Sequence, residues 1–110
     1  MKPIPVWDMD AILEAYDEAP ELIPEVERRW DTLFRFMHDN KLLKTSIVDA
    51  SGKLTTRRLY TRDFTPLGND FATSYESSYL RSKSSSDPEK GRKLLERYLK
   101  ELRAKRQRRG

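Results

Sequence analysis

Residues 24–40 read PEVERRWDTLFRFMHDN, and this stretch decides most of the fold. Its large apolar side chains recur every three to four residues, the spacing of one side of an α-helix. They are Val26, Trp30, Leu33, Phe34 and Met37. Pro24 suits a first helical position, because the N–H that proline lacks would be unpaired there. Asn40 is a residue type that often ends helices. We therefore predict a helix from about Pro24 to Asn40 whose apolar side faces the core.

A shorter helix is predicted before this one. Asp8 suits the capping position of a segment whose apolar residues have the same helical spacing, and Pro20 ends it. These apolar residues are Met9, Ile12, Leu13 and Tyr16. Two strands are predicted after residue 43, at 44–50 and 54–62. They are joined through Gly52 at a turn, and the second is rich in strand-favouring residues. Because two strands alone are marginally stable, we expect this β-hairpin to pack on the helices.

Two further helices complete the predicted fold. Thr65-Pro66 and Asp87-Pro88 are both typical helix starts. Each is followed by apolar residues at helical spacing, namely Leu67, Phe71, Tyr75 and Tyr79, then Leu94, Leu95, Tyr98, Leu99 and Leu102. The sequence thus predicts a mostly helical α+β domain of order helix, helix, hairpin, helix, helix. We expect residues 1–103 to form this single domain and residues 104–110 to be a disordered basic tail.

Length and composition narrow the class of protein. The chain has 110 residues, of which 36% are hydrophobic and 36% charged, and it has no cysteine. That length supports one core. The lack of cysteine excludes disulfides, zinc–thiolate sites and a thiol nucleophile. No apolar run approaches the roughly 20 residues that span a bilayer, and the N-terminus lacks the apolar region of a signal peptide. We expect a cytoplasmic protein with no membrane partner.

Charge is distributed unevenly along the chain. Residues 1–50 carry 6 basic and 11 acidic side chains, whereas residues 51–110 carry 16 basic and 7 acidic ones. Such asymmetry indicates a charged partner. The alternative is that the two halves attract each other, either within one fold or in a head-to-tail homodimer.

The sequence offers little material for catalysis. His38 is the one imidazole, and it lies beside Asp39. Adjacent helical residues diverge by about 100°, so we do not expect them to form an oriented pair. The acidic residues between Asp8 and Glu21 lack the spacing and central glycine of a calcium loop. No phosphate-binding glycine motif is present. We predict a protein that is not an enzyme, with no catalytic residue, metal or cofactor.

Two resemblances suggest binding functions. The segment from Leu33 to Tyr75, with Leu42-Leu43, the predicted hairpin and Thr65-Pro66-Leu67-Gly68, resembles the second half of a winged-helix domain. Arg57-Arg58-Leu59-Tyr60 resembles the return strand of the wing in small bacterial transcriptional regulators. This resemblance implies DNA binding, with Arg57 and Arg58 at phosphates or a minor groove and Arg28 and Arg29 on the reading helix. Acidic residues on the same helix, Glu25, Glu27 and Asp31, oppose that function.

The second resemblance covers Phe36 to Leu102. Lys41-Leu42-Leu43, Asp63-Phe64-Thr65-Pro66-Leu67-Gly68 and the segment from Asp87 to Leu95 resemble motifs of a family of small bacterial proteins. Lys41 replaces the glycine of that pattern. Proteins of this kind are often immunity or accessory proteins, which implies a partner protein such as a toxin or effector.

We therefore predict first a non-enzymatic protein-binding module of immunity or regulatory type, and second a DNA-binding winged-helix regulator. Protein interfaces combine complementary charge with a few aromatic anchors. The aromatic candidates are the three that fall on no apolar stripe, Trp7, Phe36 and Phe64. The charged candidates lie on the last helix and include Arg92, Arg97 and Lys100. We expect this basic helix to meet an acidic surface, or the acidic segment 8–27 to meet a basic one.

Overall fold

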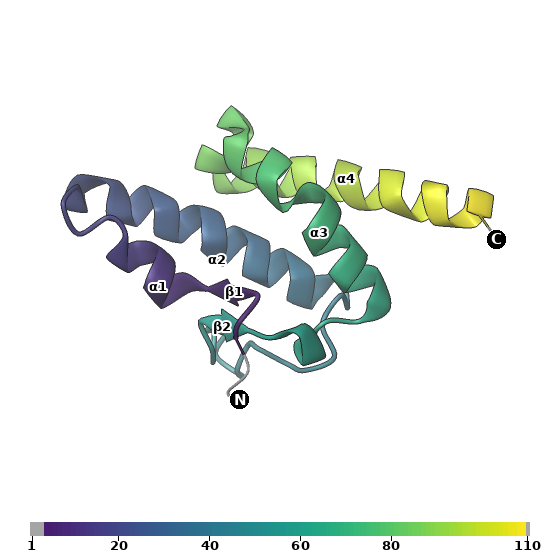
Figure 1. The fold of residues 1–110 in the computed structure, drawn as a ribbon, viewed down its shortest axis with the longest axis horizontal. Helices are drawn as coiled ribbons and strands as arrows, with labels where there is room; N and C mark the ends of the chain where they lie inside the picture. Colours follow the sequence, from purple (N-terminus) through teal and green to yellow (C-terminus); the bar gives the residue numbers. More distant parts are fainter. Residues whose placement is uncertain (1–3, 110) are drawn as a thin grey trace.

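The computed structural model describes residues 4–109, which form a mostly helical α+β fold (Figure 1). The four α-helices of this region are α1 (Met9–Glu14), α2 (Ile23–Asp39), α3 (Pro66–Arg81) and α4 (Pro88–Arg109). Short 3-10 turns occupy Pro20–Leu22, Thr61–Asp63 and Lys83–Ser86. The strands β1 (Trp7–Asp8) and β2 (Arg58–Leu59) pair in antiparallel orientation, with Trp7 opposite Leu59.

Three predicted helix starts are confirmed by local side-chain hydrogen bonds, whereas α2 begins at Ile23, one residue before Pro24, with no side-chain cap. The Asp8 side chain accepts a 3.1 Å hydrogen bond from the backbone N–H of Ala11 at the start of α1. Thr65 Oγ1 accepts one from Gly68 at 2.9 Å at the start of α3. Asp87 accepts hydrogen bonds from the N–H groups of Glu89 and Lys90 at 2.9 and 3.2 Å. These side chains satisfy N–H groups that have no partner inside the helix.

The predicted hairpin is only partly formed. Its turn is present, with Gly52 at a φ of 86° and the Asp49 N–H donating to the Lys53 carbonyl at 2.9 Å. A single bridge, between Val48 and Leu54, joins the two sides. The return strand β2 pairs instead with β1, so the prediction of strands over 44–50 and 54–62 is wrong in both length and pairing. Pairing with β1 lets Trp7 lie in the core, which stabilises this arrangement.

Helix α2 lies in the middle of the molecule, with α1 and the small sheet on one side and α3 and α4 on the other (Figure 1). It is therefore buried along two sides, and this explains why Phe36, off the predicted stripe, is fully buried. The Phe36 ring lies 5.6 Å from that of Phe71 on α3. On the opposite side, Trp7 lies 5.9 Å from Phe34 and 5.3 Å from Phe64, measured between ring centroids.

The three aromatic residues predicted as partner contacts are thus core residues. Trp7, Phe36 and Phe64 have exposed fractions of 1%, 0% and 3%. Burying rings of this size removes a large apolar area from water, which favours the core over the surface. A partner cannot reach them while the protein is folded.

The segment predicted as a disordered tail continues helix α4 to Arg109, and Gly110 lies outside the described residues. Leu102 is the last buried residue of α4, and the end of the helix projects past α3 (Figure 1). Arg106 Nη1 lies 2.6 Å from Asp70 Oδ2 on α3, which holds this last part against the fold. Between residues 4 and 109, no helix is long and apolar enough to cross a membrane.

Candidate binding surface on helix α4

Several arginines are neutralised by acidic residues from the other half of the chain. Arg57 lies 2.9 Å from Asp10 and 3.1 Å from Glu27. Arg58 lies 3.2 Å from Asp8, beside it in the sheet. The charge asymmetry of the sequence is therefore used in part to join the two halves within one fold.

These ion pairs weaken the prediction that Arg57 and Arg58 bind nucleic acid. Arg57 and Arg58 are both held in ion pairs by acidic side chains. Arg29 pairs with Glu25 at 2.7 Å and donates to the Leu80 carbonyl at 3.4 Å. Arg28 is exposed, but it borders a hollow that also contains Glu27 and Asp31. The surface around the four arginines predicted to bind nucleic acid is thus mixed in charge, which weakens its attraction for phosphate.

Helix α4 carries the largest set of cations that are not neutralised in this way. Lys93, Arg97 and Lys100 are exposed at a spacing that places them along one side of the helix. Among the described residues, Arg97 and Lys100 have no ion pair, and Lys93 lies 3.7 Å from Glu89. Two of the predicted contact residues, Arg97 and Lys100, therefore face solvent.

The third predicted contact on α4, Arg92, lies toward α2 instead. Arg92 Nη2 lies 2.8 Å from Asp39 Oδ2, and its guanidinium lies 5.9 Å from the centroid of the buried Phe36 ring. Burial alone would raise the pKa of Asp39. Hydrogen bonds from Arg92 and His38 outweigh it and hold the pKa of this carboxyl below its usual value. Arg92 is thus a link between α2 and α4 rather than a free contact residue.

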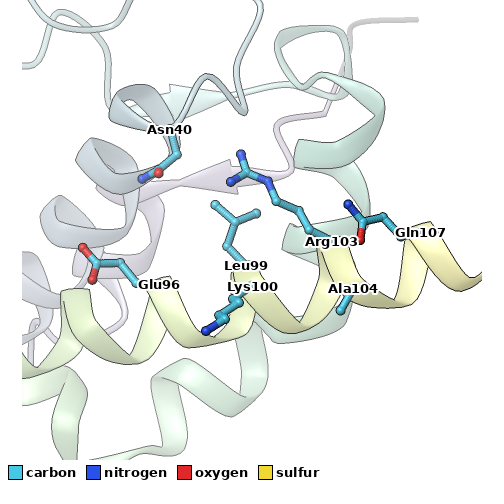
Figure 2. Close-up of a pocket in the computed structure, with 7 residues that line it drawn as sticks. All are labelled: Asn40, Glu96, Leu99, Lys100, Arg103, Ala104 and Gln107. Atoms are coloured by element: carbon cyan, nitrogen blue, oxygen red, sulfur yellow. The ribbon is translucent and has the colours of Figure 1, made fainter.

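A groove of about 500 Å³ lies between the end of α2 and the last half of α4 (Figure 2). Leu99 points into it, and the Arg103 guanidinium extends over Leu99 toward the end of α2, where Asn40 lies. Gln107 and Glu96 stand at its two ends. Arg103, like Gln107, is an exposed donor of hydrogen bonds, and no ion pair among the described residues involves Arg103. Arg103 and Gln107 give the groove donors for a carboxylate at one end, and Glu96 lies at the other end.

Sequence reasoning missed this groove, because it depends on two segments far apart in the chain. Arg103 lies among several basic residues of α4, and the sequence indicates Asn40 only as the end of α2. Asn40 does end α2, and its side-chain amide donates to the Phe36 carbonyl at 3.0 Å. Lys41 then adopts a left-handed backbone conformation with a φ of 58°, and the chain turns away from α4.

The structure also brings together Ser46, His38 and Asp39, contrary to the expectation that His38 and Asp39 would not meet. His38 Nδ1 lies 3.3 Å from Asp39 Oδ1, and Ser46 Oγ lies 3.4 Å from His38 Nε2. The Ser46 hydroxyl donates to the Val48 carbonyl at 3.2 Å. The Ser46 hydroxyl is thus within reach of both the Val48 carbonyl and the imidazole. This contact is a surface hydrogen-bond network at the end of α2.

Within residues 4–109, no group of three or more histidine and acidic side chains is placed to hold a metal ion. Comparison of the chain with protein families, with curated proteins and with solved structures gave no match.

Proposed function

We propose that this chain is a non-enzymatic protein-binding module that presents the exposed side of α4 to an acidic surface of another protein. One observation carries the proposal. The fold neutralises Arg29, Arg57 and Arg58 with its own carboxylates but leaves Arg97, Lys100 and Arg103 exposed and without ion pairs among the described residues. Complementary charge steers partners together and selects among them.

The anchors of the proposed interface differ from those that the sequence suggested. With Trp7, Phe36 and Phe64 in the core, the anchoring side chains are Arg97 and Arg103. Arginine is one of the residue types that carry most of the binding energy at protein interfaces. The groove beside Arg103 supplies a place where a partner carboxylate is partly shielded from water. Within this proposal, the chain is an immunity-type or regulatory protein whose partner is a toxin or effector with an acidic surface.

Charge reversal on α4 tests the proposal. A tagged double variant, Arg97→Glu with Lys100→Glu, is compared with the wild type in capture from lysate of the native host, after nuclease treatment and at moderate salt. The matched control, Lys44→Glu with Lys53→Glu, makes the same charge change at two exposed lysines of the loop between α2 and β2. We expect one stoichiometric protein that the wild type and the control retain and the α4 variant loses. A partner that the α4 variant retains would contradict the proposal.

A second candidate function, DNA binding by a winged-helix-like regulator, is favoured by a different observation. Beyond Leu102, α4 extends past α3 and carries Arg103, Lys105 and Arg108 with no acidic residue among them, while Arg106 pairs with Asp70 (Figure 1). A basic helix of this kind suits the phosphates beside a groove of DNA. If DNA is the partner, affinity falls steeply with salt, and removal of residues 104–110 makes that dependence shallower. Affinity that hardly changes with salt, or material whose capture survives nuclease, excludes this candidate.

A further inference from the structure

The turn between α1 and α2 forms an acidic corner, which we define as Glu14, Asp17, Glu18 and Glu21. All four side chains are exposed, and no ion pair between described residues involves any of them. In Figure 1 this corner lies at one end of the long axis of the molecule, and the C-terminal end of α4 lies at the other. The molecule thus has an acidic end and a basic end.

The acidic corner also carries an exposed apolar side chain. Leu22 directly follows Glu21 and is 41% exposed, one of the few large hydrophobic residues on the surface of the described region. It lies at the start of α2, and no partner within the fold covers it fully. The corner therefore presents carboxylates and a leucine side by side.

The α4 groove has the complementary features. Arg103 supplies positive charge inside the groove, Lys100 adds charge at its rim, and Glu96 lies at one end (Figure 2). Ala104 supplies the exposed apolar part of the lining, since Leu99 is only 3% exposed. A carboxylate of the corner can pair with the Arg103 guanidinium while Leu22 covers the apolar lining. Opposite charge combined with apolar contact is the pattern of specific protein interfaces.

We infer that the acidic corner of one molecule docks in the α4 groove of a second copy of this chain, so that the protein self-associates head to tail. The inference rests on the proposed function, since it uses the same α4 surface and names an occupant for it. Because corner and groove lie at opposite ends, the contact joins two different surfaces. Such contacts build rings where the rotation closes and open chains where it does not.

Sedimentation velocity on the full-length wild type tests this inference over a wide range of concentration, at low salt and near 1 M salt. We expect the sedimentation coefficient to rise with concentration at low salt. We expect this rise to be largely lost near 1 M salt, where charges are screened beyond about 3 Å. Wild-type protein that stays monomeric at every concentration in low salt overturns the inference.

Two neutralising variants locate the contact. The corner variant combines Glu18→Gln, Glu21→Gln and Leu22→Ser, all at exposed positions. The groove variant combines Lys100→Gln with Arg103→Gln. We expect each variant alone to self-associate at least tenfold more weakly than the wild type. A control variant, Lys44→Gln with Lys53→Gln, should self-associate like the wild type.

A mixture of the two variants gives the decisive result. The corner variant keeps an intact groove and the groove variant keeps an intact corner, so we expect one contact and hence a one-to-one heterodimer. A mixture that stays monomeric, while each variant melts like the wild type, overturns the inference. The proposed function is judged separately, because the corner variant keeps the whole α4 surface. One outcome is a monomeric wild type together with a corner variant that still captures an acidic partner from lysate. In that case the proposed function is supported and only the inference of self-association is overturned.

Discussion

Gly68 shows how a single residue sets the start of a helix. It lies where α3 passes closest to the chain after α2, and a Cβ atom there would overlap the carbonyl oxygen of Leu42. That oxygen accepts hydrogen bonds from the N–H and the hydroxyl of Thr65, at 3.0 and 3.1 Å, so it cannot move freely. The glycine of the Thr-Pro-x-Gly motif is thus required by close backbone approach.

We expect Gly68→Ala to lower the free energy of unfolding by about 3 kcal/mol, because the added methyl group meets backbone rather than a flexible side chain. Urea unfolding followed by circular dichroism measures the effect. Asn69→Ala, at the exposed next position, is the control and should change stability by less than about 0.5 kcal/mol. Equal stability of the two variants would show that the helix start can shift to make room.

Tyr79 makes the stability of the protein sensitive to alkali. Burial raises the pKa of Tyr79 to about 12, although Arg29 nearby acts in the opposite direction. Its hydroxyl donates to the Arg29 carbonyl at 2.9 Å. Because the folded pKa exceeds the usual value of 10.0, the folded state holds this proton more tightly. The resulting stability is fully present below pH 10 and is lost as the pH rises through about 12.

We expect the free energy of unfolding to fall by about 1.4 kcal/mol per pH unit over that interval through this one group. Tyr79→Phe should be less stable at neutral pH, by about 1 kcal/mol for the lost hydrogen bond. The free energy of unfolding of Tyr79→Phe should also fall less steeply with pH between 10 and about 12. Urea titrations at a series of pH values compare the two proteins. The same slope in both would show that the Tyr79 proton is not the one released.

At the scale of elements, the capped starts of α1, α3 and α4 could be predicted and the strand pairing could not. Asp8, Thr65 and Asp87 act on N–H groups two or three residues away, so the local sequence contains the signal. The partner of β2 lies about 50 residues earlier in the chain, and no nearby residue indicates it. The turn through Gly52 led to the prediction that residues 54–62 pair with the adjacent segment 44–50.

Strand β1 is predicted to contribute much of the stability, although it has only two residues. Trp7→Ala removes a ring that packs against Trp30, Phe34 and Phe64, and we expect a loss of about 3–5 kcal/mol. Ile4→Ala, at a side chain that is 83% exposed three residues earlier, should have little effect. Chemical denaturation of both variants checks this. A small loss for Trp7→Ala would mean that the fold of the helices does not depend on the strand.

For the whole molecule, the sequence predicted opposite charge in the two halves and gave attraction within one fold as an alternative, but it did not predict which residues pair. The pairing of Arg57 with both Asp10 and Glu27 depends on β1, β2 and α2 meeting in space. The α4 groove likewise depends on Asn40 and Arg103 being brought together by packing. Helical spacing did place Arg97 and Lys100 on the solvent side of α4, because that follows from the periodicity of one helix alone.

The ion pair that links α2 to α4 gives the whole molecule a dependence on acid. The lowered pKa of Asp39 means that the stability it contributes is present above the usual value of 3.8 and is lost as the pH falls through the lowered pKa. Arg92→Gln removes the main partner of Asp39, so we expect the acid-induced loss of stability below pH 3.8 to become smaller. Unfolding measured across this range tests the difference, and an identical acid profile in both proteins would contradict it.

The contact between Trp7 and Trp30 has an optical consequence. These are the two tryptophans of the chain, and their rings lie 5.6 Å apart at an angle of 72° inside the core. Intrinsic tryptophan fluorescence therefore comes from one site, shared by strand β1 and helix α2. Electronic coupling between rings this close should also give a near-ultraviolet dichroism signal that vanishes when β1 leaves α2. A spectrometer can thus follow the docking of the N-terminal strand without any attached dye.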